Sequence, residues 1–251
     1  MISTTRKRLY KILAILFWVA VWECASLLIG EELFLPSPVR VLQSLGTNLS
    51  DPSFWSTVAF TFIRIISGFL LSLFLAAALA VLSSVSNPVR FLSDPLVKII
   101  RATPVASVII LVLVWVSPKN LSAIISYLMV FPIVYTNILE GLDSMDGKLT
   151  ELARSYRMRL LKRAGHVYLP QLIPYISSAV SISSGLAWKS GIAAEVIGIP
   201  RGSIGERVYM AKIYLSTPDL FAWTVVVVIL AFVFERIFLV MMKALFRRIT
   251  G

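Results

Sequence analysis

The sequence predicts an all-α integral membrane protein in which six transmembrane helices form one domain over residues 1–251. Of the 251 residues, 58% are hydrophobic and only 15% are charged, whereas a soluble domain carries roughly 45–50% apolar and about 25% charged residues. Mean hydropathy is +0.85. The apolar residues also gather in blocks close to the roughly 20 residues that a helix needs to cross a bilayer. Lipid is therefore the expected solvent of most of the chain.

Six apolar segments meet or approach this length. They are Tyr10–Ile29, Val58–Leu82, Ala102–Val116, Leu121–Leu139, Leu172–Ile199 and Leu220–Met242. The first follows a basic N-terminus, but its length and the acidic pair after it favour a retained span over a cleaved signal peptide. The fifth is long and contains Gly185, Gly191 and Gly198. We therefore expect the fifth span to bend or break.

The basic residues between these segments predict the orientation of the chain. With the N-terminus in the cytoplasm, sixteen Lys and Arg residues fall in the inner connections and five in the outer ones. Positive charge concentrates on the cytoplasmic side of membrane proteins, so both termini are expected there. For the same reason the net charge of +11 does not indicate nucleic-acid binding. Two outer connections, residues 35–50 and Ser203–Leu215, are expected to contain short interfacial helices.

The inner connection at about residues 141–168 is the most informative stretch of the sequence. Leu149, Leu152, Ala153 and Tyr156 have the i, i+3, i+4, i+7 spacing that places them on one face of a short helix. A second short helix is expected to carry Met158, Leu161 and Ala164 on its apolar face. Such a helical pair below the membrane would leave apolar surface exposed to water, so we expect a cytoplasmic protein to cover it.

This connection resembles the EAA loop of ABC-importer permease subunits, the element that docks on the ATP-hydrolysing subunit. Glu151, Ala153 and the closing Leu169-Pro170 stand at the separations of that motif, and Leu152 replaces its first Ala. Arg157 stands where the family usually has a glycine, which allows a bend that Arg adopts poorly. The resemblance assigns ATPase coupling to Glu151, Leu152, Ala153, Arg154, Tyr156, Arg157, Arg159, Leu169 and Pro170. The alternatives are a solvated basic face and helix capping by Glu151.

Further motifs extend the resemblance to the nitrate/sulfonate/taurine-like subgroup of type I importers. They are Leu35-Pro36-Ser37-Pro38, Arg101-Ala102-Thr103-Pro104, Leu113-Val114-Trp115, Phe131-Pro132-Ile133, Gly141-Leu142, Ala193-Ala194-Glu195 and Gly202-Ser203-Ile204-Gly205. The resemblance implies a bacterial cytoplasmic membrane protein that pairs with a second permease subunit as a homodimer. It also implies cytoplasmic ABC ATPase subunits and an extracytoplasmic substrate-binding protein. The implied solute is a small organic anion, an oxyanion or a vitamin precursor.

The sequence has no Gly-rich phosphate-binding loop followed by Lys. We therefore expect this chain to be a transport subunit and not an enzyme, without a cofactor of its own, while ATP and Mg²⁺ bind the partner ATPase. His166 is the only histidine and Cys24 the only cysteine. A metal site is accordingly not expected, and a disulfide within the chain is impossible.

Ionisable residues inside the predicted spans mark candidate functional positions, because each is costly in lipid unless it is paired or hydrated. They are Glu23, Arg64, Lys189, Glu195, Glu235 and Arg236. A translocation path is predicted along Ser177, Ser181, Ser184, Trp188, Lys189 and Glu195. The alternative for the serine stripe is close helix packing. Lys189 and Glu195 lie about 240° apart around a helix, so each is expected to find partners elsewhere, and Lys189 would suit an anionic solute.

Two other classes of membrane protein were weighed against the importer permease. A secondary transporter or channel that works without ATP would favour an inverted repeat and paired broken helices, and neither is visible in the sequence. An integral-membrane enzyme would need a nucleophile, base or metal constellation. The sequence shows no such constellation, and a secondary transporter or channel leaves the loop at about residues 141–168 unexplained.

Overall fold

The computed structural model describes residues 4–250, and every regular element within this range is a helix. The helices are α1 (Thr4–Ile29), α2 (Pro38–Ser50), α3 (Pro52–Val85), α4 (Asn87–Ala102), α5 (Val105–Leu113), α6 (Pro118–Asp143), α7 (Gly147–Ser155), α8 (Leu160–Arg163), a π-helical turn (Ala164–Tyr168), α9 (Leu169–Gly198), α10 (Ile204–Ile213) and α11 (Thr217–Thr250).

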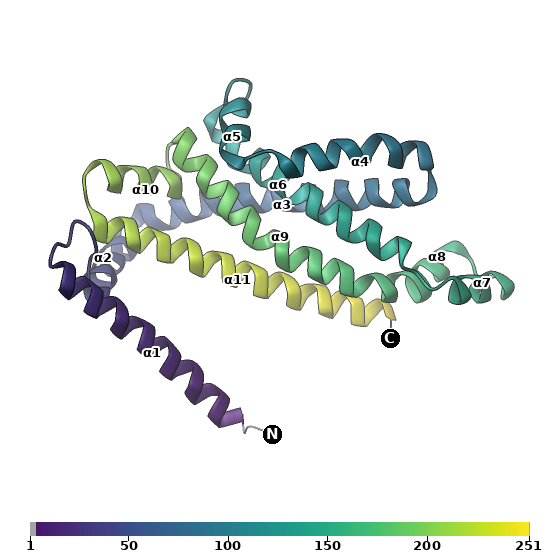
Figure 1. The fold of residues 1–251 in the computed structure, drawn as a ribbon, viewed down its shortest axis with the longest axis horizontal. Helices are drawn as coiled ribbons and strands as arrows, with labels where there is room; N and C mark the ends of the chain where they lie inside the picture. Colours follow the sequence, from purple (N-terminus) through teal and green to yellow (C-terminus); the bar gives the residue numbers. More distant parts are fainter. Residues whose placement is uncertain (1–3, 251) are drawn as a thin grey trace.

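The body of the molecule is a bundle of the long helices α3, α6, α9 and α11 (Figure 1). The short helices α2 and α10 lie at one end of this bundle, and α7 and α8 lie at the other end. The N-terminal end of α1 and the C-terminal end of α11 both point away from the end that holds α2 and α10. The chain therefore runs back and forth along one common direction, as a multi-pass membrane protein does.

Four helices are long and apolar enough to cross a bilayer: Leu9–Ile29, Pro52–Val85, Pro118–Asp143 and Thr217–Met242. The number rises to five when α4 and α5 are taken together as one bent span. The 30-residue helix α9 is not among these candidates, and its sequence carries six serines besides Lys189 and Glu195. The all-α, multi-pass architecture is confirmed, whereas the count of six spans stays a prediction.

The third predicted span, Ala102–Val116, is wrong as a single helix. The chain instead forms α4 and then the nine-residue α5, and the two helices meet at an angle of 102°. Thr103 and Pro104 explain the break: a residue that precedes proline avoids the helical region, and Thr103 has an extended backbone with ψ 131°. Arg101 therefore lies in the last turn of α4, just before the bend.

The fifth predicted span, Leu172–Ile199, lies within a single uninterrupted helix, so the expected break is wrong. A Cβ on Gly191 would lie only 2.7 Å from side-chain atoms of Ile65 and Ser126, so this glycine allows α9 to approach α3 and α6 closely. Gly68 plays the same part between α3 and α6, because a Cβ there would lie 2.1 Å from the Ala123 carbonyl oxygen.

The two interfacial helices predicted in the outer connections are confirmed as α2 and α10. Ser37 caps α2 by accepting a hydrogen bond from the Arg40 amide at 3.3 Å, and Pro38 begins the helix. Ser203 caps α10 by accepting from the Glu206 amide at 3.0 Å. Serine at these positions satisfies amides that a helix start otherwise leaves without partners.

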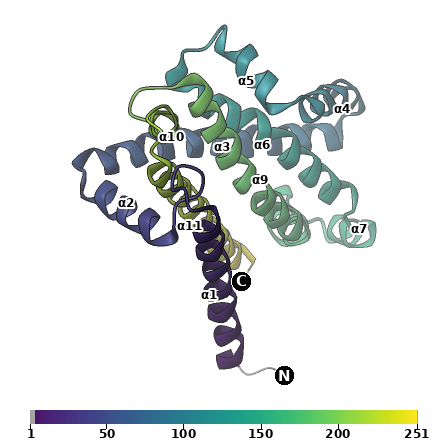
Figure 2. The same ribbon diagram turned by 60° about the vertical axis from the view of Figure 1, so that its left-hand side comes forward.

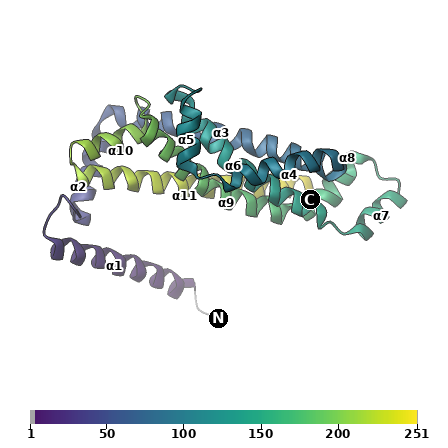
Figure 3. The same ribbon diagram turned by 45° about the horizontal axis from the view of Figure 1, so that its top comes forward.

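Helix α1 stands apart from the rest of the molecule, as Figures 2 and 3 show. Only 6% of its apolar span is buried. Its described attachments lie near its C-terminal end, where Trp22 Nε1 donates to the Pro36 carbonyl at 3.0 Å and Ser26 Oγ donates to the Leu35 carbonyl at 2.9 Å. Large apolar side chains are exposed along α1 from Leu9 to Ile29.

Candidate functional site

The loop between α6 and α9 is tied to the bundle at its start. The Asp146 amide donates to Gln171 Oε1 at 2.9 Å, and Gln171 Nε2 donates to the Val167 carbonyl at the same distance. Asp146 Oδ1 in turn accepts from the Lys148 amide at 2.8 Å, which satisfies a free amide in the first turn of α7. The position of α7 is thus set by side chains near the first turn of α9.

The apolar face predicted for α7 is exposed in the structure. Ala153 is buried, but Leu149, Leu152 and Tyr156 are 46%, 55% and 76% exposed. One small residue therefore attaches the helix to its own chain, while three large residues face outward. An exposed group of large apolar side chains on so short a helix is typical of a protein–protein contact.

Arg157 ends this helix in the left-handed backbone region, with φ +50°. The Met158 amide donates to the Ala153 carbonyl at 3.1 Å, a bond that closes the end of the helix around the left-handed residue. Glycine is the usual residue in this position. The bend is thus present where the family glycine would allow it, although Arg occupies the position.

The second half of the loop differs from the expected second helix. Helix α8 has only four residues and continues through the π-helical turn directly into α9. Met158 is half-buried and Ala164 is exposed, while the Leu161 side chain lies outside the described residues. The loop therefore consists of one free-standing helix, α7, and a short N-terminal extension of α9.

The remaining coupling candidates are distributed along the same loop. Glu151, Arg157 and Arg159 are exposed, and no ion pair joins any of the three to another described residue. Leu169 and Pro170 are half-buried in the first turn of α9, where proline is tolerated. The side chain of Arg154 lies outside the described residues.

The residues of the serine stripe predicted as a path on α9 differ in burial: Ser177 is half-buried, Ser181 is exposed and Ser184 is buried. Ser184 and Trp188 are buried, and the Trp188 ring lies 5.9 Å from that of Phe62 on α3. Ser181 Oγ donates to Glu235 Oε1 on α11 at 2.6 Å, which links the two helices. Ser177 is half-buried, and Lys189 alone of the six residues is exposed without a hydrogen bond in the described part of the chain. Ser184 and Trp188 are thus packed within this chain, and the path along the stripe stays a prediction.

Glu195 is fully buried near the C-terminal end of α9. Its Oε2 atom accepts from Thr61 Oγ1 at 2.8 Å and from the Gly205 amide at 3.2 Å. The Thr61 oxygen accepts from the Ile204 amide at 2.9 Å. Lys189 takes no part in this cluster, so the prediction that Glu195 finds partners on another helix is confirmed. In this chain the carboxylate joins α3, α9 and the start of α10.

A cavity of about 500 Å³ opens beside the bend between α4 and α5. Its walls come from the end of α4, the start of α5, the middle of α6 and one side of α9. Pro132 lies in the α6 wall, where its missing N–H leaves the carbonyl of Leu128 without its helical partner. The bend and this proline thus lie beside the same opening between the helices.

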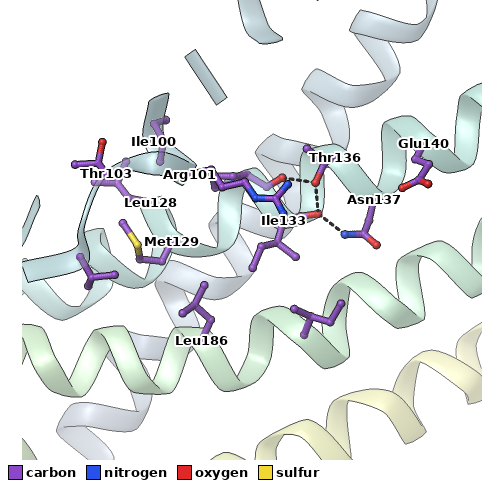
Figure 4. Close-up of a pocket in the computed structure, with 13 residues that line it drawn as sticks. Ile100, Arg101, Thr103, Leu128, Met129, Ile133, Thr136, Asn137, Glu140 and Leu186 are labelled. Carbon is purple, nitrogen blue, oxygen red and sulfur yellow. Dashed lines mark hydrogen bonds between the residues drawn. The ribbon is translucent and has the colours of Figure 1, made fainter. Parts of the chain in front are cut away.

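Five polar residues line this cavity: Arg101, Thr103, Thr136, Asn137 and Glu140. In Figure 4 the Arg101 side chain points from α4 toward the part of α6 that carries Ile133 and Thr136. Thr136 Oγ1 donates to the Pro132 carbonyl at 2.8 Å, and Asn137 Nδ2 donates to the Ile133 carbonyl at 2.8 Å. The Asn137 side-chain oxygen therefore remains an available acceptor. Arg101 and Glu140 are both exposed.

A second cavity of about 260 Å³ shares Thr136 and Glu140 with the first and extends to the start of α4 and the end of α6. There Arg90 binds Asp143 through two hydrogen bonds of 3.1 Å and 2.7 Å. Tyr135 donates to Asp94 at 2.8 Å. Polar side chains thus continue from the first cavity toward the end of the bundle that holds α7 and α8.

The sequence reasoning missed this polar track. Arg101 was counted among the cytoplasmic charges, and Glu140 lay just past a predicted span. The signal that points to them is the Thr103-Pro104 dipeptide, which turns the chain and brings the end of α4 against α6. In the described part of the chain no group of three or more His, Cys, Asp or Glu residues could hold a metal ion.

Known proteins resemble the chain over most of its length. Residues 68–251 match the family described as binding-protein-dependent transport system inner membrane component. The taurine transport system permease protein TauC of Escherichia coli (strain K12) is 29% identical over 235 residues, which cover 91% of this chain and 84% of TauC. The putative aliphatic sulfonates transport permease protein SsuC of the same strain is 31% identical over 203 residues, covering 79% and 76%.

SsuC of Bacillus subtilis (strain 168) is 26% identical over 211 residues, which cover 83% of this chain and 76% of that protein. Among solved structures, a chain from the crystal structure of an amino acid ABC transporter with histidines matches with a TM-score of 0.58 and 20% identity. The match covers 78% of this chain and 94% of that one. This likeness concerns the fold.

Proposed function

The chain belongs to the family of binding-protein-dependent transport system inner membrane components, and from this we propose that it forms the solute path of an ATP-driven importer and couples that path to a separate ATPase. Within the family it is a type I ABC importer permease of the sulfonate and taurine-like group. Proteins of this kind are transport components and not enzymes. In the proposed assembly ATP and Mg²⁺ bind the partner ATPase.

The observation that carries the coupling role is the exposed apolar face of α7. Leu149, Leu152 and Tyr156 extend from a helix whose only buried predicted residue is Ala153. The left-handed turn at Arg157 holds α7 against the extension of α9. A groove on the ATPase that accepts this face would move α7 and α9 together when the ATPase pair closes.

We place six spans in the membrane, with both termini and α7 on the cytoplasmic side. Four helices qualify by length and composition, the bent α4–α5 pair makes a fifth, and α9 runs along α6 in the same bundle. The N-terminal end of α1 and the C-terminal end of α11 point away from α2 and α10 (Figure 1). The excess of Lys and Arg in the inner connections supports the same orientation.

The proposed assembly contains a second copy of this chain, and α1 supports that part of the proposal. Its apolar residues from Leu9 to Ile29 are largely exposed, and the contacts described for it lie near α2 and Phe221. A neighbouring permease subunit would bury part of this surface. The opposite end of the molecule, with α2 and α10, would face the extracytoplasmic substrate-binding protein.

The proposed solute is a small organic anion or oxyanion of the sulfonate and taurine type. The names of the E. coli and B. subtilis relatives support this class. Arg101 and Asn137 support it from the structure, because both line one cavity with N–H donors: the guanidinium of Arg101 and the second amide hydrogen of Asn137. Arginine is well suited to planar or multi-oxygen anions through paired hydrogen bonds.

The coupling proposal can be tested by tagged purification from the native cell in mild detergent, for wild type, Glu151→Arg and Leu152→Glu. Mass spectrometry would identify the co-purified chains, and ATP hydrolysis would be assayed. Ile213→Glu is the matched control, because Ile213 is 54% exposed against 55% for Leu152 but lies at the α10 end.

We expect an ABC ATPase to accompany wild type and Ile213→Glu and to be lost or uncoupled in Leu152→Glu. Equal ATPase recovery with all four proteins would place the contact outside α7. Absence of any ATPase from wild type would favour a transporter that works without ATP. If Glu151→Arg keeps the ATPase and Leu152→Glu loses it, the apolar face is the docking surface and Glu151 caps the helix.

A further inference from the structure

We infer that the cavity beside the α4–α5 bend is a binding site for a small zwitterion, in which Arg101 holds the acidic group and Glu140 holds the ammonium group. This inference rests on the proposed function and narrows its solute class. Aliphatic sulfonates without an amino group and inorganic oxyanions carry negative charge only, whereas the cavity presents both a cation and an anion.

The first observation is that these two charges do not neutralise each other. No ion pair within 4.0 Å joins Arg101 or Glu140 to any residue in the described part of the chain. By contrast, Arg90 and Asp143, one to three turns away on the same two helices, form a paired contact at 2.7 Å. Arg90 and Asp143 thus pair with each other and link α4 to α6. Arg101 and Glu140 remain unpaired and line the cavity.

The second observation is the depth of the site. Arg101 is the fifteenth residue of α4, so about 21 Å of helix separates it from the end of the bundle where α4 begins. An arginine so far along a membrane limb is costly unless water, a protein partner or a ligand satisfies it. Since the described side chains supply no counter-ion, the partner of Arg101 must be water, a lipid headgroup, a residue of a second subunit or a bound solute.

The order of the polar groups along α6 sets the shape of the ligand. Arg101 points toward Ile133 and Thr136 (Figure 4), and Glu140 follows Thr136 by one helical turn, or about 6 Å along the axis. Asn137 lies between them, with its side-chain oxygen free to accept from an ammonium or a hydroxyl group. A short carbon chain between the acidic group and the ammonium would let one ligand reach both charges, and Leu128, Met129 and Leu186 give the same cavity apolar surface.

Two sources could supply such a molecule: a solute in transit, or the headgroup of phosphatidylethanolamine, which also joins an anion to an ammonium group. We assign the site to the solute, because the second cavity continues the polar lining from Glu140 toward the start of α4. A lipid headgroup would need no such continuation.

The test measures binding to the complete permease–ATPase complex in nanodiscs that lack phosphatidylethanolamine, with the binding protein left out. Isothermal titration calorimetry would compare taurine, which carries both charges, with ethanesulfonate, which lacks the ammonium, and ethylamine, which lacks the acid. Each probe would be titrated into wild type, Arg101→Gln and Glu140→Gln. Lys212→Gln and Glu31→Gln are control variants, because both residues are exposed and lie outside the cavity.

Wild type should bind taurine more tightly than ethanesulfonate, and ethylamine least. Arg101→Gln should weaken both sulfonates by about tenfold or more, the loss expected for hydrogen bonds to a charged group. Glu140→Gln should weaken taurine alone by a similar factor and remove the preference over ethanesulfonate. Lys212→Gln and Glu31→Gln should leave the three affinities unchanged.

The inference is overturned if wild type does not prefer taurine, or if Glu140→Gln weakens both sulfonates equally. It is also overturned if taurine does not bind while lipid analysis finds phosphatidylethanolamine retained by wild type and lost from both cavity variants. ATP hydrolysis in the same samples separates the two proposals. If the ATPase is bound and active but wild type binds taurine and ethanesulfonate equally well, only the zwitterion site is contradicted. If no ATPase is bound, the importer proposal itself is contradicted.

Discussion

Thr61 on α3 and Glu195 on α9 are joined by a buried hydrogen bond of 2.8 Å at the α10 end of the bundle. The threonine hydroxyl both donates to the carboxylate and accepts from the Ile204 amide at 2.9 Å. One hydroxyl thus connects two long helices and the first turn of a third. Because both residues are fully buried, water cannot replace the bonds when either partner is removed.

Thr61→Val should therefore lower stability, because it leaves the buried Ile204 amide without an acceptor while keeping the side-chain shape. A buried unsatisfied polar group costs about 1–3 kcal/mol. The measurement is the thermal midpoint of the purified protein in nanodiscs. Thr224→Val is the control, since Thr224 bonds only to the Leu220 carbonyl of its own helix at 2.8 Å. Equal midpoints for the two variants would contradict the role assigned to Thr61.

Gly68→Ala should disturb the contact between α3 and α6, because its Cβ would lie 2.1 Å from the Ala123 carbonyl oxygen. Backbone atoms must then move apart, and overpacking of this kind typically costs about 1–3 kcal/mol. Gly46→Ala on α2 is the matched control, because nothing lies within 4 Å of the added Cβ. Its free energy of unfolding should rise by roughly 0.5–1 kcal/mol, since alanine is favoured over glycine inside a helix. Denaturation in mixed micelles would compare them, and a stable Gly68→Ala protein would refute the close approach.

Arg157→Gly should stabilise the end of α7, because a left-handed conformation costs a non-glycine residue roughly 1–2 kcal/mol. Hydrogen exchange of the α7 amides is the measurement, and slower exchange is expected. Arg159→Gly serves as the comparison, since Arg159 is not among the residues with positive φ. Glycine there adds only freedom to the unfolded chain. Faster exchange in Arg157→Gly would mean that the arginine side chain, and not the backbone, holds the turn.

Cys24 offers a direct test of the proposed pair of permease subunits. It is the only cysteine in the sequence and is exposed on α1, so one nitroxide label can be attached without engineering. A homodimer whose partner covers α1 should give a narrow distribution of label–label distances in a pulsed electron spin resonance measurement. A mixed pair of different permeases would give no dipolar signal, and an α1 surrounded only by lipid would give a broad distribution.

The parts of the fold that follow from composition and local signals were predictable from the sequence. Apolar length identified α1, α3, α6 and α11, and the two outer connections, residues 35–50 and Ser203–Leu215, were long enough to indicate α2 and α10. The spacing of Leu149, Leu152 and Tyr156 predicted the exposed face of α7. Each of these signals depends on residues that are close together in the chain.

The errors arose where distant residues decide the outcome. The glycines of α9 suggested a broken helix, but whether a glycine breaks a helix or permits close packing depends on what lies opposite, here Ile65 and Ser126. The same limit applies to the cavity. Arg101 and Glu140 are 39 positions apart in the sequence, and only the packing of α4 against α6 brings them to the same cavity.

Helix α8, the π-helical turn and α9 follow one another without a break and form one continuous rod. Most of this rod is α9, which has 30 residues and is therefore about 45 Å long. A tilt of about 5° imposed at the α7 end would displace the far end of such a rod by about 4 Å. That far end is fastened through Glu195 to α3 and to the start of α10. A small push at the α7 end of the bundle would thus reach the α10 end as a shift of atomic size.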